Sequence, residues 1–295
     1  MSEEEQAQHD SAQQGREDVQ LRSAFRHSVE EGVARLHRSW PGLLATGMMG
    51  GVDVSMGVLA MLVVQEATGS AMLGSLAFSI GFLALALGKS ELFTENFMVP
   101  VAAMAAGKAS LARLIRLWGG TLVMNLIGGW LFAWLIVWGL PEIHETAVHL
   151  GTIFADLSPG RAVALGLIGG TAITLMTWME NGAESEIARL AAVVAIGFLL
   201  AAGHLNHVIV VSLEMFVALH TGVAPFGYAE WAQVAGIAAV TNLAGGLVLV
   251  TLLRLVQVGR KPIERERLRP TQATLQDEED EEDGGERGPD LGRAS

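Results

Sequence analysis

Six long apolar stretches follow one another along the chain, separated by short polar segments. Each, apart from the longer, interrupted second stretch, is close to the roughly 20 residues that an α-helix needs to cross the hydrocarbon core of a bilayer. The pattern therefore predicts an all-α integral membrane protein with six transmembrane helices. The stretches cover about Leu43–Val64, Met72–Ala106, Trp118–Trp138, Ala162–Trp178, Leu190–Val211 and Val234–Leu253.

The second stretch is interrupted by polar residues. The segment GKSELFTENFMVP at Gly88–Pro100 places a lysine, two glutamates and an asparagine between apolar flanks. Charged groups at this depth are costly, and irregular backbone survives in a bilayer only where it is buried in protein or lines a cavity. We interpret this segment as the break in a transmembrane helix that borders a pore.

The N-terminal region divides into two parts. Residues 1–22 are polar, lack a signal-peptide pattern and are expected to be disordered. Residues 23–40 predict an amphipathic helix, which lies either at the membrane surface or on other cytoplasmic segments. Its apolar positions are Phe25, Val29, Val33, Leu36 and Trp40.

A channel domain is expected over residues 41–258, and a polar tail over residues 259–295. The tail contains the run DEEDEED at Asp277–Asp283. Like charges repel one another and remain solvated, so this tail is expected to be disordered.

The composition agrees with a membrane protein. Of 295 residues, 51 % are hydrophobic and 17 % are charged, and the mean hydropathy of +0.41 is high for a globular domain. No cysteine is present, which excludes disulfides, thiol catalysis and thiolate metal ligands. The net charge of −12 arises mainly at the two ends of the chain. The expected partners are the lipid bilayer and a small solute, with no nucleic acid.

Arginine and lysine residues predict the orientation. If the N-terminus is cytoplasmic, the basic residues around the six stretches fall in inner segments, and the outer loops contain only Arg161. This asymmetry follows the positive-inside rule. It predicts a multi-pass protein of the inner (cytoplasmic) membrane with both termini in the cytoplasm.

The chain also contains an internal repeat. NLIGG at Asn125–Gly129 recurs as NLAGG at Asn242–Gly246, 117 residues later, and Gly50–Gly51 recurs as Gly169–Gly170 after 119 residues. Gly88 matches Gly203, at which AGHLNHV interrupts the fifth stretch. Three spans per half is an odd number, so the second half must be inverted relative to the first. Inverted repeats with paired broken helices are typical of transport proteins.

Several polar residues near the two breaks are candidates for function. His204, Asn206 and His207 lie together at the second break, where a histidine can exchange a proton near neutral pH. No third ligand is suitably spaced for a metal. Lys89 is either an attractor for anions or a partner of Glu91. Phe78 and Phe82 lie one turn apart and either form an apolar constriction or pack between helices.

These residues resemble those of the formate/nitrite transporter family, and most closely its YfdC-like branch. The resemblance rests on GFLALALGKSELFTENF, in which the LFT segment matches the broken loop of the second helix, and on NHVIVVSLEMF in the fifth. It implies an aquaporin-like protomer, a homopentamer with one pore per subunit, and substrates that are small monovalent anions or their weak acids, often moved with a proton.

Carried over by position, Thr94 and His207 are the hydrogen-bonding pair of the pore centre, next to Asn206. Apolar constrictions are implied at Phe78, Phe82 and Leu200 on one side and at Leu92 and Phe93 on the other. The chain departs from the family pattern in four places. Asn206 replaces an acid, Gly170 replaces an asparagine, and Lys89 replaces a small residue. The family's lysine near the outer mouth has no clear match, although Arg161 lies close in sequence.

The sequence therefore predicts a proton-linked channel or transporter rather than an enzyme, without cofactor or metal. A pore for neutral solutes or gases is the main alternative. A membrane scaffold that acts through its acidic tail is another, and an intramembrane hydrolase with Ser212 near His207 is a third.

Overall fold

The computed structural model describes residues 3–270, and all regular elements in this range are helical. Five helical segments are long and apolar enough to cross a membrane, namely α2, α3, α5, α7 and the continuous run Tyr228–Val258, while α9 is a shorter apolar helix. The elements are α1 (Glu3–His37), α2 (Trp40–Thr68), α3 (Ala71–Gly88), η1 (Phe93–Phe97), α4 (Val99–Ala105), α5 (Leu111–Gly139), η2 (Pro141–Ile143), α6 (His144–Ala155), α7 (Pro159–Gly182), α8 (Glu186–Ala202), α9 (Val208–His220), α10 (Tyr228–Ala244), the π-helical η3 (Gly245–Leu252), α11 (Leu253–Val258) and α12 (Arg260–Leu268).

Serine residues begin four of the long helices. The hydroxyls of Ser39, Ser70, Ser110 and Ser185 each accept a hydrogen bond from the backbone N–H three residues later. Such caps satisfy one of the N–H groups that the first turn of a helix leaves without a partner. Gly69 separates α2 from α3 with a positive φ of 67°, a conformation that favours glycine.

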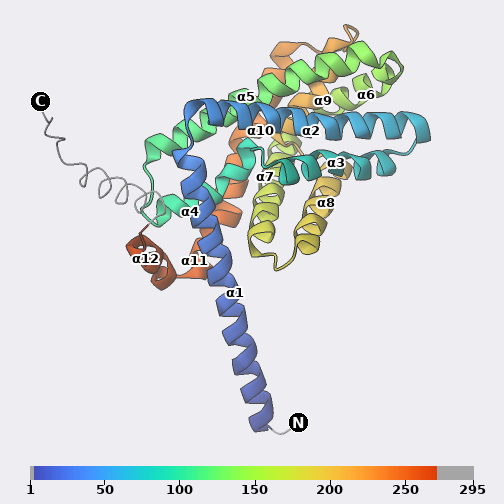
Figure 1. Ribbon diagram of the computed structural model, residues 1–295. Coiled ribbons are helices and arrows are strands. Elements are labelled where there is room, and N and C mark those ends of the chain that lie inside the picture. Colours follow the sequence, from blue (N-terminus) through green and yellow to red (C-terminus); the bar gives the residue numbers. More distant parts are fainter. Residues whose placement is uncertain (1–2, 271–295) are drawn as a thin grey trace, which may run out of the picture.

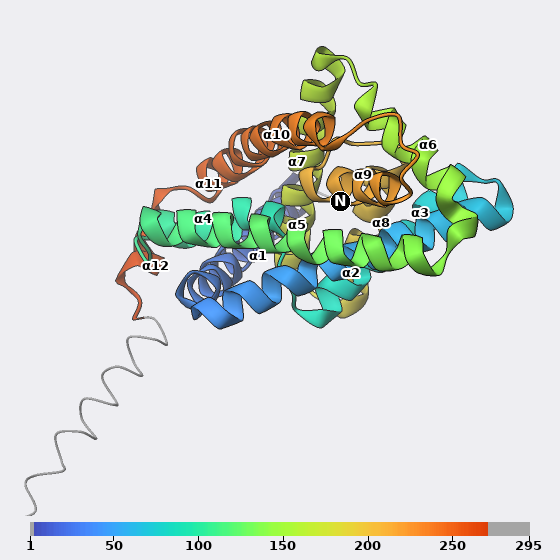
Figure 2. The same ribbon diagram turned by 90° about the horizontal axis from the view of Figure 1, so that it is seen from above.

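Two similar helix groups form the body of the molecule. α2 packs against both α3 and α5, and α7 packs against both α8 and α10 (Figures 1 and 2). Both predicted interruptions are present, because α3 ends at Gly88 and α8 ends at Ala202. The fifth apolar stretch is thus divided between α8 and α9 and does not end at Val211.

The prediction of disorder for residues 1–22 is wrong for the described part, because α1 begins at Glu3 and continues without a break to His37. Residues 3–22 contain no proline and a single glycine, and they are rich in glutamate, glutamine, alanine and arginine, which favour helices. α1 projects from the body, with its N-terminal half beyond the other helices (Figure 1).

The amphipathic helix expected over residues 23–40 ends at His37, and its apolar face packs on other parts of the protein. Phe25 and Val29 lie in a cluster with Met98 and Ala102 of the α4 region. A Cβ atom on Gly32 would lie 2.3 Å from the carbonyl oxygen of Val99, so glycine is required for this close approach of α1 to α4.

Part of the predicted tail is also ordered. Residues 260–268 form α12, which packs beside α1, whereas the acidic run Asp277–Asp283 lies outside the described residues.

The loop expected between the third and fourth stretches contains another helix, α6, which packs against α9.

Candidate functional site

The two interrupted helices share a backbone feature: a residue with positive φ follows the first half of each. Lys89 follows α3 with a φ of 56°, and His204 follows α8 with a φ of 45°. Within residues 3–270 these are the two non-glycine residues with positive φ, and they are separated by the same 115 residues as Gly88 and Gly203. Such conformations are uncommon outside glycine and cost energy, so the surrounding structure must hold them.

Asn125 of α5 holds the first break. Its side-chain oxygen accepts the backbone N–H of Phe93 at 2.8 Å. Its amide nitrogen donates to the carbonyl of Glu91 at 2.8 Å and to that of Gly47 in α2 at 2.6 Å. One buried side chain therefore satisfies three backbone groups and ties the loop to two helices.

Asn242 of α10 holds the second break in the same way. Its oxygen accepts the N–H of Val208 at 2.8 Å, and its nitrogen donates to the carbonyls of Asn206 at 2.9 Å and Gly166 of α7 at 2.8 Å. Each partner lies 115 to 119 residues after its counterpart in the first set. The NLxGG repeat in the sequence thus supplies the asparagine that anchors each loop.

The two breaks meet at Thr94 and His207. The Thr94 hydroxyl oxygen lies 2.6 Å from Nε2 of His207, and both side chains are fully buried. Nδ1 of His207 accepts the backbone N–H of Val210 at 3.4 Å at the start of α9. Since a neutral imidazole has one N–H, this network assigns the proton to Nε2, which donates to Thr94. The hydroxyl hydrogen of Thr94 remains available to a further acceptor.

The five apolar residues expected to form constrictions are all buried. They belong to one continuous cluster of buried side chains, in which the rings of Phe78 and Phe82 meet edge to face at 5.5 Å. The set consists of Phe78, Phe82, Leu92, Phe93 and Leu200, each at most 6 % exposed.

Asn206 is fully buried beside His207. Its amide nitrogen donates to the carbonyl of Ala162 in α7 at 3.0 Å, while its side-chain oxygen has no hydrogen-bond partner among the described residues. A second buried oxygen of this kind belongs to Glu214 of α9. An unsatisfied buried polar atom is costly, so each marks a place at which a further donor can bind.

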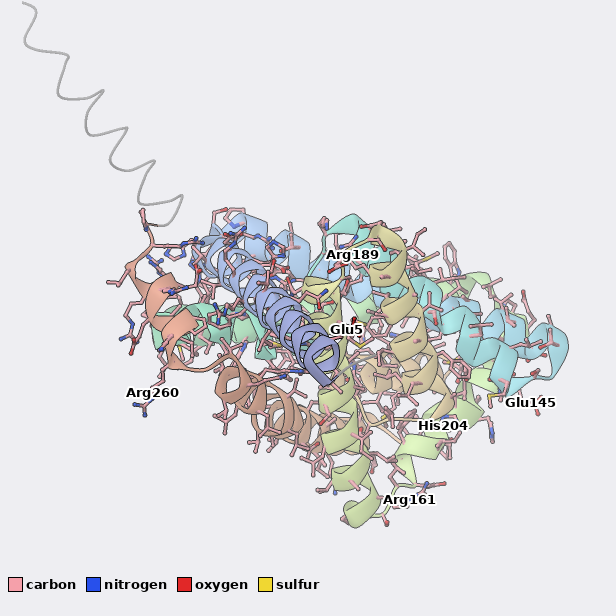
Figure 3. All side chains as sticks on the ribbon, turned by 90° about the horizontal axis from the view of Figure 1, so that it is seen from below. Glu5, Glu145, Arg161, Arg189, His204 and Arg260 are labelled. Carbon is pink, nitrogen blue, oxygen red and sulfur yellow. The ribbon has the colours of Figure 1, made fainter. Side chains whose placement is uncertain are left out.

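A cavity of about 530 Å³ opens at one side of the first break. Its inner wall includes Glu91 and Glu95, which lie on either side of Leu92, Phe93 and Thr94 in the sequence. Its outer wall is formed by α1 and by the polar ends of α7 and α8. We call this space the vestibule. Figure 3 shows that Arg189, which lines it, and His204 lie at opposite ends of α8.

Two arginines at the C-terminal end of α1 hold the carboxylates of the vestibule. Arg38 bonds to the Glu91 carboxylate. Arg35 lies 3.8 Å from Glu91 and 3.7 Å from Glu95, and it also donates to Glu31. Burial raises the pKa of Glu31, but the Arg35 guanidinium outweighs it and holds that pKa below its ordinary value.

The sequence did not reveal this role of Arg35 and Arg38. There the basic residues served only to predict which side of the membrane each segment faces. A local signal was present, since Glu31 and Arg35 are four residues apart and form an ion pair on one helix face. Nothing in the sequence indicates that this face meets Glu91, which lies in a segment more than 50 residues away.

The alternative in which Lys89 pairs with Glu91 is wrong, because Glu91 is held by Arg38 and Arg35. Lys89 is exposed in the vestibule and makes no ion pair within the described part of the chain. The neighbouring Ser90 hydroxyl donates to the Asp53 carboxylate of α2.

The close packing of α7 on α10 explains why position 170 is a glycine and not the asparagine of the family pattern. A Cβ atom there would lie 2.1 Å from the backbone oxygen of Asn242, so the asparagine expected from the family pattern cannot be accommodated in this packing.

The described residues contain no group of three or more histidine, aspartate or glutamate side chains arranged to hold a metal ion.

Comparisons with known proteins match most of the chain. The family model described as formate/nitrite transporter matches residues 22–256. The chain is 26 % identical over 242 residues to the inner membrane protein YfdC of Escherichia coli strain K12. The aligned region covers 79 % of this chain and 77 % of that protein. It is 26 % identical over 174 residues to the formate channel BtFdhC of Bacillus thuringiensis, covering 55 % of this chain and 66 % of that channel.

Two solved structures share the fold. An FNT family ion channel matches with a TM-score of 0.70 at 17 % identity, covering 78 % of this chain and 96 % of that one. A pentameric formate channel with formate bound matches with a TM-score of 0.54 at 22 % identity, covering 75 % of this chain and 93 % of that one.

Proposed function

Because the chain belongs to the formate/nitrite transporter family, as its sequence resemblance predicted, we propose that it is a transmembrane channel for small monovalent anions or their weak acids. The buried contact between Thr94 and His207 carries this proposal, because it joins the two broken helices at a polar point within an apolar cluster. The relatives named as formate channels support formate or a similar anion as substrate.

The proposed protomer has six membrane crossings in two inverted halves of three. In the first half these are α2, the broken pair α3 and α4, and α5. In the second they are α7, the broken pair α8 and α9, and α10 with α11. The matched hydrogen bonds of Asn125 and Asn242 support this pairing. Three crossings per half require the second half to be upside down.

The apolar layers oppose a bare anion. Moving an ion into a dry constriction costs several kcal/mol or more, whereas a neutral weak acid avoids most of this cost. In the proposed mechanism the anion gains a proton as it loses water and crosses the layers as the acid. The free hydroxyl hydrogen of Thr94 donates to a substrate oxygen, and His207 supports that hydroxyl and relays the proton.

Two departures from the family pattern change the electrostatic potential around the proposed pore. Asn206 places a neutral amide beside His207, so no fixed negative charge there repels an anion. Lys89 adds a cation to the vestibule, where it is proposed to attract anions towards Leu92 and Phe93. Electrostatic attraction of this kind raises the rate of entry more than the affinity.

We assign the protein to the inner membrane as a homopentamer, with α1 and α12 in the cytoplasm. The distribution of arginine and lysine supports this orientation. The packing of α1 beside α12 puts the two terminal segments on one side. Large apolar side chains on α3, including Met72, Leu76 and Ile80, are about half exposed and suit contact with lipid or neighbouring subunits.

Flux into proteoliposomes tests this function. The purified protein is reconstituted, and uptake of formate, nitrite and glycerol is followed by light scattering at several external pH values. Formate and nitrite uptake should exceed glycerol uptake and rise as the external pH falls, and His207→Asn should alter that pH dependence. Rapid glycerol flux would favour a neutral-solute pore, and anion flux independent of pH would exclude the proton-linked step.

The other two alternatives have weaker support. Ser212 donates to the carbonyl of Val208 at 2.6 Å, and His207 is engaged with Thr94 and Val210, so the described residues contain no nucleophile–base contact between Ser212 and His207. A scaffold predicts that deletion of residues 262–295 abolishes function while pore variants leave it intact.

A further inference from the structure

A second groove, of about 540 Å³, lies between α1 and α12. Each helix contributes two arginines to its lining, Arg22 and Arg26 from α1 and Arg265 and Arg269 from the α12 segment. Among the described residues that line the groove, Glu266 is the one carboxylate, and it lies 3.3 Å from Arg269. The charges of these lining side chains sum to a positive value, and Arg26 also meets Glu30 of α1, outside the lining, at 3.3 Å.

The same groove contains uncovered apolar surface. Val19 is 65 % exposed and Leu268 is 84 % exposed, and both belong to its lining. A groove with a basic rim and apolar positions suits an extended peptide that carries acidic residues and an occasional aliphatic side chain.

The two helices that form the groove are held in place by specific contacts. Ile263 of α12 packs on the cluster that contains Phe25 of α1. The Lys108 ammonium donates to the carbonyl of Arg267 at 3.1 Å and to that of Arg269, which caps the C-terminal end of α12. The chain therefore leaves α12 at a defined position beside the groove.

We propose that the acidic segment Asp277–Asp283 of the same chain docks in this groove. The segment consists of seven consecutive acidic residues and begins eight residues after Arg269. Eight residues span up to about 26 Å when extended, which is enough to return to a groove that Arg269 itself lines. Leu275 lies two residues before the acidic run in the sequence and supplies the aliphatic side chain that the apolar positions of the groove require in this proposal.

The tether favours this occupant over free ligands of the same charge. A short linker gives an effective concentration in the millimolar range, so several weak charge pairs are enough for docking. Anionic lipid headgroups present the same charge on the cytoplasmic side, and the test below separates them from the tail.

Disulfide trapping tests the docking in the full-length protein. Because the chain has no native cysteine, the double variant Ser23→Cys/Gly284→Cys contains a single possible disulfide within each copy. Ser23 lines the groove, and Gly284 follows the acidic run directly. The protein is placed in phosphatidylcholine nanodiscs at low ionic strength, oxidised with copper phenanthroline, and analysed by peptide mass spectrometry.

Rapid formation of a disulfide within one copy is expected. The rate should fall at least about tenfold in 1 M salt, where charges are screened beyond about 3 Å. A similar fall is expected when the seven acids are replaced by asparagine and glutamine, or when Arg22 and Arg265 are replaced by glutamine. The matched control is the double cysteine variant with the native tail and groove.

Three results would overturn the proposal. The neutral tail could react as fast as the native one, which would show only tethered diffusion. The disulfide could join two copies, which would assign the groove to a neighbouring subunit's tail. Phosphatidylglycerol nanodiscs could abolish the reaction that phosphatidylcholine permits, which would assign the groove to lipid headgroups. The readout is structural and does not depend on the transported substrate.

Discussion

The Thr94 hydroxyl oxygen and Nε2 of His207 lie 2.6 Å apart, although 113 residues separate them in the sequence. Thr94 belongs to η1 after the first break, and His207 caps α9 after the second. Their bond therefore joins the two interrupted helices directly, and each loop fixes the polar group that the other one meets.

Loss of the Thr94 hydroxyl should impair flux. In Thr94→Val, Nε2–H of His207 loses its acceptor and the substrate loses a donor. The unsatisfied donor lowers the stability of the protein, whereas flux depends on the hydrogen bond lost to the substrate, which is worth about 0.5–1.5 kcal/mol and corresponds to a fall in formate flux of roughly 2- to 13-fold. Thr94→Ser retains the hydroxyl and should preserve most of the flux in proteoliposomes. Equal loss in both variants would contradict a role for the hydroxyl.

The two anchoring asparagines should contribute similarly to stability. Asn125→Ala and Asn242→Ala each leave one backbone N–H and two carbonyls without their partner. We expect each variant to lose about 2–4 kcal/mol, measured by thermal unfolding in detergent.

Asn181→Ala is the control for these variants, because the Asn181 side chain anchors neither loop: it donates to the Thr177 carbonyl within its own helix and also bonds to Glu31 of α1. It should lower the melting temperature much less. A large effect at one anchor and none at the other would count against equivalent loops.

Gly170→Ala should destabilise the protein, whereas Gly236→Ala should not. A Cβ atom on Gly170 would lie 2.1 Å from a backbone oxygen, but one on Gly236 meets nothing within 4 Å. Alanine is intrinsically better than glycine in a helix by about 1 kcal/mol, so packing alone decides the sign. The melting temperature should fall for Gly170→Ala and stay level or rise for Gly236→Ala.

Lys89→Gln should slow anion entry by a few-fold at low ionic strength. The difference from the unaltered protein should shrink as salt screens the lysine. Initial rates of formate uptake at increasing concentrations of an impermeant salt measure this effect. Lys261→Gln removes a positive charge from α12, outside the vestibule lining, and should leave the rates nearly unchanged. A Lys89→Gln defect that persists in high salt would point to packing instead of charge.

The ion pair of Glu31 with Arg35 should make the docking of α1 sensitive to acid. The pKa of Glu31 is lowered in the folded protein from an ordinary value of 4.5, so its stabilising effect is complete above about pH 4.5 and is lost as the pH falls through the lower folded value. The Glu31 side chain is 40 % exposed, so the contribution is below about 1 kcal/mol.

Thermal unfolding of the unaltered protein and of Glu31→Gln, followed from pH 6 to pH 3, measures this contribution. The difference in melting temperature should be present at pH 6 and vanish at the acidic end. Glu30→Gln is the control, since Glu30 is 59 % exposed and meets Arg26 at 3.3 Å. A difference that grows towards acid pH would show that the ion pair does not stabilise the folded protein in this way.

Much of the site was predictable because polar residues are conspicuous in apolar segments. Gly88 and Gly203 were matched as breaks from the sequence, and the helices end there or one residue earlier. Thr94 and His207 were paired through the family resemblance, and the structure brings their side chains together. The role of Asn125 and Asn242 was only partly visible, since the repeat was seen but not the hydrogen bonds that it provides.

The sequence by itself determined the helical membrane class and the two breaks, because hydrophobicity and charge act locally along a chain, and its family resemblance supplied the pair of residues at their centre. Tertiary structure alone decided that Arg35 of α1 and Arg38 directly after that helix hold Glu91, and that Lys89 does not. It also decided that α1 packs on α4. Ion pairs and close helix contacts depend on distances between segments remote in the sequence, and no local pattern encodes those distances.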